Sequence, residues 1–570
     1  MKRLLSYLLP GIVLATACAK SKTDILPGNK PTTANLAAST VRLVHGSQLD
    51  LVMNNTDTLT NWVFMNTSLD AQQPQPRPYP TPYFPGTGKL SGNYFLPQQF
   101  LDAKGQAIVK LFALEENQPS GQPLVKFATL LDSFLVQEDY NQPKDYYLMS
   151  TRPPADGTLG VTVIPRAVIP STDPTHIRIR LISLKYDRGT YGQSGPVSLA
   201  FADGSLVSPV TSGVAEGTWS DYADLPYGNY QFRVRLDGTP KQIPGAPAIR
   251  SQVVSETDHT IASANGQYYV STMTFQPGGA YSLLVSGDTR GGYEVQGQSG
   301  TIPIYAFQFI TDITPSANLV YARVQGINAA EKNGLHLLVD GADSAIGYSI
   351  ASGYQTLITG NHSVKVTDGA GKTLAQTTIT VKGGDNLSLW VYPTLSGTDS
   401  IVTVQNNMGG VRQNGITGDG SDAGSLLIDP LNVNPIVQTR FLNLCPDLPY
   451  VTFTRANGTL IKESMFTAAL AARNLRPGQP ADPIAVPYPY VDLGFGDPGT
   501  VEAYQSQPNA IPGNPLTGVP DLTPADFVRM PAYYYPAETA GMEPGVYTVA
   551  LIGRSRNGEQ PKMIVIKHNL

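Results

Sequence analysis

The side chains of this sequence that could do chemistry are scattered along it. The six histidines stand singly in different stretches, so none has a partner at metal-ligand spacing. There is no H-E-x-x-H and no G-x-S-x-G motif, and Ser194 and Ser299 sit in G-Q-S-G, which lacks the second glycine at the required place. The sequence therefore predicts no catalytic residue, no metal site and no cofactor. The histidines are His45, His176, His259, His336, His362 and His568.

Three short stretches partly match ligand-binding loops. Gly494–Gly499 fits G-x-G-x-x-G, but a proline turn stands where a helix N-terminus must supply N–H groups, so we interpret it as a turn. Gly371–Thr373 ends like a phosphate loop but lies between two strand patterns, which predicts a hairpin tip. Asp419–Asp422 carries alternating oxygen ligands without a closing glutamate, so a polar linker is favoured over the alternative of a calcium loop.

The charged residues argue against nucleic acid as a partner, and their carboxylates leave a hydrolase as the one enzymatic alternative. The net charge of -5 is spread thinly and no basic patch is present, so nucleic acid is not an expected partner. A hydrolase could use paired carboxylates such as Asp497 and Glu502. Because the chain has 44 acidic residues, such pairs arise by chance. The sequence thus favours a protein that is not an enzyme, with an envelope hydrolase as the alternative.

The first cysteine has the setting of a lipid attachment site. Two basic residues, an apolar run over Leu4–Leu14 and small residues at Ala15 and Ala17 precede Cys18. The run is too short to span a bilayer stably, which indicates a cleaved export signal. The segment resembles the lipobox of bacterial lipoproteins, and this implies a diacylglyceryl group on the Cys18 thiol and cleavage before it. An ordinary secretory signal is the alternative.

Lipidation at Cys18 sets the expected location. Residues 1–17 would be the signal peptide and residues 18–40 a polar tether without strand or helix periodicity. No other apolar stretch approaches the length of a membrane span, so the lipid is the expected membrane attachment. Ala19 after the cysteine favours the outer membrane by resemblance to other lipoproteins. The cell surface and the periplasmic face both remain open.

The second cysteine, Cys445, has no partner for an internal disulfide once Cys18 carries lipid. It alternates with Phe441 and Asn443 in a strand-like pattern. We therefore interpret Cys445 as a small buried hydrophobic residue rather than a nucleophile.

Proline-rich aromatic stretches are the best candidates for ligand binding. They cover Pro74–Gly86, Val486–Gly496 and Pro531–Pro536. Prolines stiffen extended backbone, so rings carried there are presented at low entropic cost to sugar rings or partner proteins. The alternative is that the rings cover sheet edges and junctions between modules. The candidate residues are Tyr79, Tyr83, Phe84, Tyr488, Tyr490, Tyr533, Tyr534 and Tyr535.

The elements that position these loops are strands. Glycine (55 residues) and proline (47) are abundant, tyrosine (29) far exceeds tryptophan (3), and 41% apolar residues can fill cores. Ile177, Ile179 and Leu181 alternate with Arg178 and Arg180, which predicts a sheet with one wet face. The best helical pattern is Lys462–Arg473. The predicted fold is all-β, with tandem immunoglobulin-like antiparallel β-sandwiches and one short helical insertion.

Recurring strand patterns divide the chain into modules. The opening strands lie in Val41–Ser47, Ile177–Ser183, Tyr321–Asn328 and Thr439–Asp447. Strands that follow a turn and begin near a tyrosine recur in Leu225–Leu236, Pro277–Gly287 and Pro544–Gly553. The predicted modules are 41–170, 175–313, 317–412 and 436–570, with a linker at 413–435.

These repeats and the lipobox resemble a bacterial family of domains of unknown function that is carried in tandem by Bacteroidetes-type surface lipoproteins. Thr439–Phe453 with Pro544–Gly553 matches the family pattern best, and Gly334–Gly341 supplies its hairpin. The resemblance covers most of Val41–Leu570 and implies an immunoglobulin-like fold and an envelope location. It supplies no catalytic residue.

Together these patterns predict a non-catalytic envelope lipoprotein. It would be attached to the membrane through lipid on Cys18 and would display β-sandwich modules for ligand or partner binding, or serve a structural role. A glycan or an envelope protein is the expected type of partner. An accessory glycan-binding lipoprotein of a nutrient-uptake system is the principal alternative.

Overall fold

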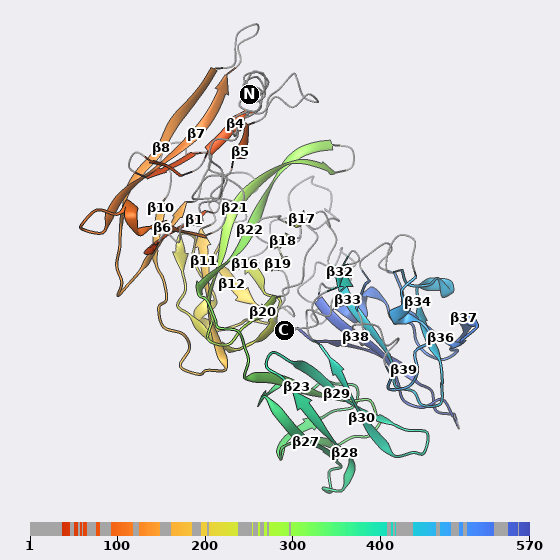
Figure 1. Cartoon of the computed structure of the whole chain (residues 1–570). Helices are drawn as coiled ribbons and strands as arrows, with labels where there is room; N and C mark the ends of the chain where they lie inside the picture. The colour runs from red at the N-terminus through yellow and green to blue at the C-terminus, as the bar shows by residue number, and fades with distance from the viewer. Residues whose placement is uncertain are drawn as a thin grey trace, which may run out of the picture. The chain divides into compact units, whose positions relative to one another are not determined.

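A computed structural model shows a chain built almost entirely of strands (Figure 1). It is 56% strand and 5% helical, with no helix of 7 or more residues in the part described, which confirms the all-β prediction. No helix in that part is long and apolar enough to cross a membrane. The structure describes residues 37–45, 51–54, 57–59, 61–64, 76–79, 93–117, 125–148, 161–184, 195–201, 205–236, 253–254, 260–262, 267–270, 273–295, 298–406, 412–413, 416–417, 437–462, 468–479, 490–493, 499–528, 545–556 and 558–569.

The chain forms two compact units, Met1–Arg166 and Ala167–Leu570. Unit 1 contains the first sandwich. Its strands are β1 (Ala38–His45), β2 (Leu51–Asn54), β3 (Asp57–Thr58), β4 (Asn61–Phe64), β5 (Pro76–Tyr79), β6 (Asn93–Pro97), β7 (Gln106–Asn117), β8 (Val125–Gln137), β9 (Lys144–Leu148) and β10 (Val161–Pro165). One sheet has the order β10-β9-β1-β6 and the other β3-β2-β7-β8, with a separate β4-β5 ribbon. Val41, Leu43, Val109 and Leu111 meet in the core between the sheets.

The second sandwich opens unit 2. Its strands are β11 (His176–Leu184), β12 (Val197–Ala200), β13 (Thr218–Trp219), β14 (Ala223–Pro226), β15 (Gly228–Tyr230), β16 (Arg233–Leu236), β17 (Val253–Val254), β18 (Thr260–Ala262), β19 (Gln267–Val270), β20 (Met273–Phe275), β21 (Ala280–Val295) and β22 (Gln298–Ile313). The two larger sheets have the orders β13-β11-β21-β22, with β14 also on β11, and β12-β16-β19-β18-β17. Ile177, Ile179 and Leu181 point into the core, as their alternation predicts.

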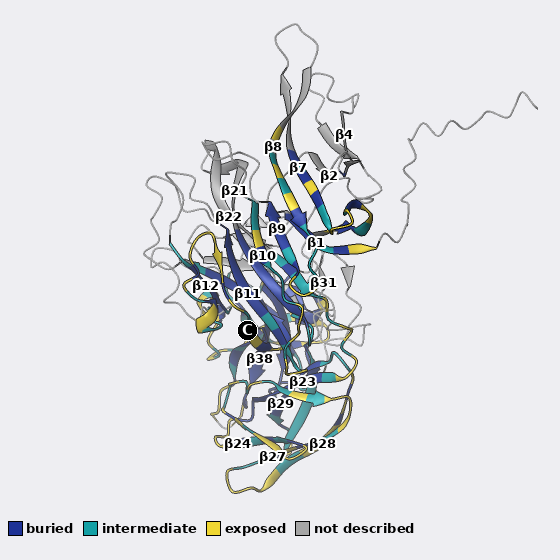
Figure 2. Ribbon diagram, turned by 90° about the vertical axis from the view of Figure 1, so that its left-hand side faces the viewer, coloured by how far each residue is buried: buried dark blue, intermediate teal, exposed yellow. Residues whose placement is uncertain are grey.

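The third sandwich follows directly. Its strands are β23 (Tyr321–Asn328), β24 (Leu335–Val339), β25 (Ala342–Ile346), β26 (Gln355–Ile358), β27 (Gly360–Thr367), β28 (Thr373–Val381), β29 (Asn386–Pro393) and β30 (Asp399–Gln405). They form sheets of order β26-β23-β29-β30 and β25-β24-β27-β28. Figure 2 shows that β24, β27 and β28 carry intermediate and exposed residues, whereas β29 is buried along most of its length. Gly371, at φ +82°, lies in the turn that joins β27 to β28, so Gly371–Thr373 is a hairpin tip as predicted.

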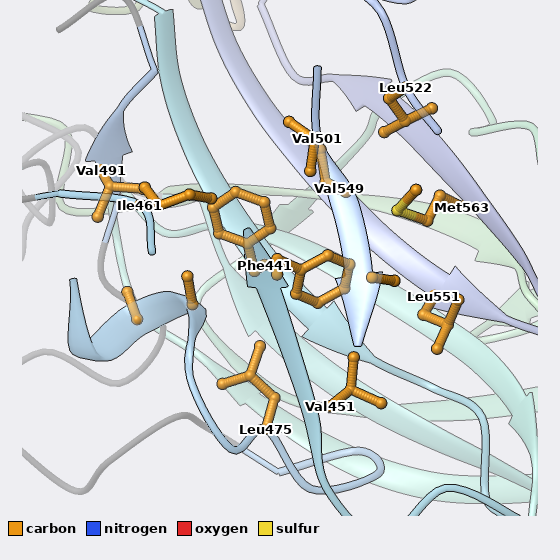
Figure 3. Close-up of a cluster of buried hydrophobic side chains, with 14 of the residues drawn as sticks. Phe441, Val451, Ile461, Leu475, Val491, Val501, Leu522, Val549, Leu551 and Met563 are labelled. Carbon is orange, nitrogen blue, oxygen red and sulfur yellow. The ribbon is translucent and has the colours of Figure 1, made fainter. Parts of the chain in front are cut away.

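The fourth sandwich holds the largest core. Its strands are β33 (Val437–Asn443), β34 (Val451–Thr454), β35 (Val491–Asp492), β36 (Glu502–Gln507), β37 (Ala510–Pro515), β38 (Gly545–Ile552) and β39 (Lys562–Lys567). They form sheets of order β35-β33-β38-β39 and β34-β36-β37. Figure 3 shows Phe441 of β33 among apolar side chains from several elements of this sandwich, including Val451 of β34 and Leu551 of β38.

One arrangement recurs in all four sandwiches. The opening strand lies inside a sheet and runs parallel to a later, closing strand: β1 with β9, β11 with β21, β23 with β29 and β33 with β38. The closing strand then pairs in antiparallel fashion with the last strand. Each of these sheets therefore contains one parallel pairing, where the sequence suggested antiparallel sheets throughout. The connection between the two parallel strands runs through the opposite sheet, and this gives it the length that a parallel crossover needs.

The described part of the predicted helical insertion holds one short helical turn. Within Lys462–Arg473, the described residues contain only the 3-10 helix η5 (Leu470–Ala472), and a bridge pairs Lys462 with Ala468. Leu470 is exposed, while Ala469, Ala471 and Ala472 are buried. The small alanines, rather than the large apolar residues, face the core here, so local helical spacing did not decide the structure.

Candidate functional site

Tyr490 is the one predicted ligand-binding residue whose side chain the structure describes. It is 2% exposed and immediately precedes β35, the strand that pairs with β33. Its ring centre lies 4.2 Å from Cζ of Arg440. The ring thus covers its own sheet and has no open face for a ligand. Tyr79 ends β5, but its side chain lies outside the described residues, as do Cys18, Tyr83, Phe84, Tyr488, Tyr533, Tyr534 and Tyr535.

The contact between Tyr490 and Arg440 is one instance of a repeated arrangement. In each sandwich it lies on the sheet that contains the opening strand, on the face turned away from the core, which we call the outer face. An aromatic ring lies near an opening-strand arginine in every sandwich: Phe95 with Arg42, Tyr222 with Arg180, Tyr354 with Arg323 and Tyr490 with Arg440. Arg180 is only 3% exposed, so the prediction of a wet face is wrong at this position. Gln231 and Arg233, which also alternate with core residues, are each 2% exposed.

Polar residues recur at three matched positions on these outer faces, and we call each set an outer-face triad. The first position is on the opening strand, the second is its partner on the closing strand, and the third lies at the end of the last strand. The triads are Arg42, Asp145 and Arg166; Arg180, Ser282 and Asp312; Gln325, Ser388 and Asn406; and Arg440, Thr548 and His568.

The first triad is a buried ion pair. Arg42 Nε donates a 2.9 Å hydrogen bond to Asp145 Oδ1, and its Nη2 contacts the other carboxylate oxygen. Arg166 Nη1 donates to the same carboxylate at 2.7 Å. Arg42 and Asp145 are both 0% exposed. Burial of these charges is tolerated because two guanidinium groups satisfy one carboxylate.

The second triad forms a short chain of hydrogen bonds. Arg180 Nε donates to Ser282 Oγ at 2.7 Å, and Ser282 Oγ in turn donates to Asp312. The Tyr222 hydroxyl donates to the same carboxylate at 2.7 Å. Burial, with the Asp312 charge second, raises the pKa of Tyr222. The guanidinium, the two hydroxyls and the carboxylate therefore form one connected hydrogen-bond network on this face.

The third and fourth triads exchange contacts with each other. Arg440 Nη1 donates to Asn406 Oδ1 at 2.8 Å, and Arg440 Nη2 donates to the carbonyl oxygen of Gln405. In the opposite direction, Gln325 Nε2 lies 2.7 Å from Nδ1 of His568. The first position of each triad thus contacts the third position of the other. This reciprocal pattern is that of an isologous interface between two copies of one fold.

Two asparagines give separate evidence that the third and fourth sandwiches correspond position by position. Asn328 and Asn443 end β23 and β33, and each donates two hydrogen bonds from its amide to backbone carbonyls later in the same sandwich. Each also accepts a bond from the backbone N–H two residues later, that of Ala330 or Cys445. The third and fourth sandwiches are therefore equivalent in register at this end of the opening strand.

An apolar layer surrounds the exchanged contacts. We call it the joint layer, and it is formed by residues of both sandwiches. Trp390 of β29 is its largest member at 0% exposure, and its indole N–H donates to Ser388 at 2.9 Å. Two sheets packed through such a layer bury their outer faces as a core would. The members are Ile327, Ala329, Trp390 and Val404 from the third sandwich, and Leu442, Leu444, Ala550, Ile552, Ile564 and Ile566 from the fourth.

Two described histidines outside the triads make contacts within their own sandwich. His336 pairs with Asp343 at 2.9 Å and His362 with Asp340 at 2.6 Å, each within one sandwich. Among the described residues, no group of three histidine, cysteine or acidic residues is placed to hold a metal ion. The candidate calcium loop, Asp419–Asp422, lies outside the described residues.

Glu502 and Cys445 have structural environments. The Glu502 carboxylate accepts backbone N–H bonds from Asn457 and Gly458 at 3.0 and 3.1 Å. Its supposed catalytic partner Asp497 lies outside the described residues. Burial raises the pKa of the Cys445 thiol to about 11, which keeps it protonated at neutral pH. This matches its interpretation as a buried small residue.

Sequence reasoning missed the triads, although a signal was present. Each opening strand carries an arginine among core residues, at Arg42, Arg180, Arg323 and Arg440. When a strand that contributes residues to a core also carries an arginine in every module, this indicates that the opposite face of its sheet is covered too. A scan against models of protein families finds no match to the chain, and no curated protein matches it.

Proposed function

We propose that this protein is a non-catalytic, lipid-anchored envelope protein whose β-sandwich modules form a scaffold that displays loops to ligands or partners. The exchange of contacts between Arg440 and Asn406, and between Gln325 and His568, carries the proposal. These polar groups are buried in a joint between sandwiches, where they hold modules in place and are closed to substrate. Membership of the family of tandem lipoprotein domains is part of the same proposal.

The lipid anchor is tested at Cys18. The full-length protein expressed in a Gram-negative host should carry acyl groups on Cys18, detected by mass spectrometry of the N-terminal peptide. Cys18→Ala should release the protein from the membrane fraction, because two or three acyl chains provide the attachment. Cys445→Ala is the matched control and should leave the protein in the membrane. An unmodified Cys18 in membrane-bound protein would contradict the proposal.

The side of the membrane is part of the same proposal. An outer-membrane lipoprotein that faces outward loses its body when intact cells are treated with a protease, whereas one that faces the periplasm is cut only after the outer membrane is opened. The predicted tether over 18–40 is corrected at its end, because β1 already begins at Ala38. The expected cleavage region is therefore the polar stretch before β1, whose sequence shows no strand or helix pattern.

Ligand binding is assigned to the proline-rich aromatic loops. The candidates are Tyr79, Tyr83, Phe84, Tyr488 and Tyr533 to Tyr535; Tyr490 is left out because it is buried. Glycan arrays and pull-downs from envelope extracts, made with residues 19–570, should identify a ligand whose binding falls at least tenfold in Tyr488→Ala or Tyr83→Ala. Tyr140→Ala is the control, since Tyr140 is 72% exposed and lies outside these loops. A glycan would favour an accessory role in nutrient uptake, and equal binding by all variants would remove these loops from the proposal.

A further inference from the structure

Strand β28 forms one edge of the sheet β25-β24-β27-β28 in the third sandwich. It pairs with β27, and the hydroxyl of Thr380 also donates to β27, to the side-chain oxygen of Asn361 at 2.6 Å. Among the described residues no other strand pairs with β28. β30 lies near it across the sandwich but belongs to the opposite sheet. One long side of β28 therefore presents backbone N–H and carbonyl groups to a further strand.

The sequence of β28 lacks the features that protect an exposed edge. Over its 9 residues, Thr373–Val381, it carries no charged residue, no proline and no glycine. Threonine, isoleucine and valine, which favour strands, make up most of it. Exposed edges in natural proteins are usually short, charged or interrupted by proline, because an unprotected edge accepts a strand of another molecule. The composition of β28 thus favours pairing with another chain.

Other edge strands of unit 2 carry these protective features. β25, at the opposite edge of the same sheet, has 5 residues and contains Asp343. β37, at an edge in the fourth sandwich, contains Pro512 and Pro515, which have no N–H to donate. β39, at an edge of the other sheet of that sandwich, carries Lys562 and Lys567. In contrast to these three strands, β28 is open to pairing.

The side chains of β28 alternate between the two faces of its sheet. Gln376, Thr378 and Thr380 are exposed on the face turned to solvent, whereas Ile379 and Val381 are buried in the core. Figure 2 shows exposed and intermediate residues on the neighbouring strands β24 and β27 as well. A second strand with the same alternation, added at this edge, continues both the apolar face and the polar face of the sheet.

We propose that β28 is a self-association edge, at which two copies of this chain pair through antiparallel β28 strands. The two four-stranded sheets then form one continuous sheet, with about one new backbone hydrogen bond for each residue of β28. The occupant is a second copy for two reasons. An uncharged strand does not repel its own copy, and a two-fold axis at Thr377 pairs Thr373–Val381 over its full length. This inference goes beyond the proposed function and depends neither on the lipid anchor nor on a displayed ligand.

Disulfide capture in membranes tests the register of this pairing. With the axis at Thr377, Gln376 lies opposite Thr378 of the second copy, and the Cβ atoms of such a pair are about 4.5–5.5 Å apart. Full-length protein with Gln376→Cys, Thr378→Cys and Cys445→Ala, oxidised with copper phenanthroline in membranes of the expressing host, should therefore form a covalent dimer.

The matched control for the capture lies on the adjacent strand. Lys365 and Ser363 of β27 pair in register with Gln376 and Thr378, so they are exposed on the same face but one strand further from the second copy. Lys365→Cys with Ser363→Cys, in the same Cys445→Ala background, should give about tenfold less dimer, because the distance across the axis is then too long for a disulfide.

Charge pairs test the same contact without oxidation. Gln376→Glu with Thr378→Glu places like charges opposite each other and should raise the dissociation constant of the dimer about tenfold. Gln376→Glu with Thr378→Lys places each carboxylate opposite an ammonium group and should keep the constant within about threefold of the parent. Both side chains are exposed, so thermal unfolding should stay as in the parent. Sedimentation velocity of the full-length protein in detergent measures the constants.

Four results would each overturn the proposal. The parent protein sediments as a monomer at every concentration, the two cysteine variants give equal yields of dimer, the oxidised product contains a different protein, or the two charge variants dissociate alike. Parallel pairing of the two strands gives the last result, because glutamate then faces glutamate and lysine faces lysine in the second charge variant.

Discussion

Arg440 donates a 2.8 Å hydrogen bond from Nη1 to the side-chain oxygen of Asn406, and the two residues come from different sandwiches. The guanidinium also packs against the ring of Tyr490 at 4.2 Å and is 2% exposed. A buried cation of this kind is stabilised by its polar partners and by the face of the ring. Arg440 therefore connects the outer face of its own sheet to the last strand of the neighbouring sandwich.

Removal of the Arg440 side chain should destabilise the joint. Arg440→Ala leaves the Asn406 oxygen and the Gln405 carbonyl without this donor and exposes a gap beside Tyr490, so we expect a loss of about 3 kcal/mol in the free energy of unfolding. Urea denaturation followed by Trp390 fluorescence measures it. Arg556→Ala is the control, because Arg556 is exposed, and should change the free energy by less than about 0.5 kcal/mol. Equal effects of the two variants would contradict this role of Arg440.

Gly478 should tolerate no side chain, because the fourth sandwich approaches the third at this position. Its φ is +65°, and a Cβ there would lie 2.2 Å from the hydroxyl oxygen of Tyr392. Gly478→Ala should cost about 1 kcal/mol for the backbone and about 1–3 kcal/mol more for the overlap. Gly397, at φ +87° with nothing within 4 Å of a Cβ, supplies the matched control.

Comparison of the two alanine variants isolates the contact from the backbone strain. Gly397→Ala should show the backbone cost alone, and adding Tyr392→Phe to Gly478→Ala should recover part of the difference because it removes the overlapping oxygen. Thermal unfolding of the four proteins is the measurement. If Gly478→Ala and Gly397→Ala are equally stable, Tyr392 does not approach Gly478 in solution.

Cys445 should resist alkylation in the folded protein. Burial raises the pKa of its thiol to about 11 from 9.0, so the thiolate that reacts is scarce at pH 8 and is shielded from solvent. Iodoacetamide at pH 8 should modify Cys445 at least 100-fold more slowly in native protein than in urea-unfolded protein. Peptide mass spectrometry after timed quenching measures both rates, and rapid labelling of the native protein would contradict the assignment.

The same shift in the pKa of Cys445 predicts how stability depends on pH. The folded state binds the thiol proton more tightly than the unfolded state, so this contribution is full below pH 9.0 and is lost as the pH rises toward about 11. Cys445→Ala should flatten the decline in urea midpoint over that interval. A decline of unchanged steepness would show that other groups cause it.

The sandwich architecture could be predicted from local patterns. Ile177, Ile179 and Leu181 alternate with polar residues, and this alternation places them in the core where the structure finds them. The chain of core residues along an opening strand is a property of neighbouring positions, so one sequence is enough to recognise it. The hairpin tip at Gly371–Thr373 was predictable for the same reason.

Contacts between sandwiches could not be predicted in this way. Alternation shows that Arg180 and Ile179 face opposite sides of a sheet, but it does not show whether another layer covers the polar side. Arg440 meets Asn406 only because two registers and one packing arrangement bring them together over a separation of 34 positions. The expected helix at Lys462–Arg473 failed for a related reason, since packing of Ala471 and Ala472 overrides local spacing.

The central claim is that the third and fourth sandwiches are joined through the joint layer and behave as one body. Its most direct test is to change the fourth sandwich and observe the third. In protein whose one tryptophan is Trp390 of the third sandwich, Ile566→Ala in the fourth should shift the urea midpoint of Trp390 emission by an amount equivalent to about 2–5 kcal/mol, because both residues belong to the same buried layer. If the Trp390 transition is unchanged while the fourth sandwich is destabilised, the two sandwiches fold independently and the account is contradicted.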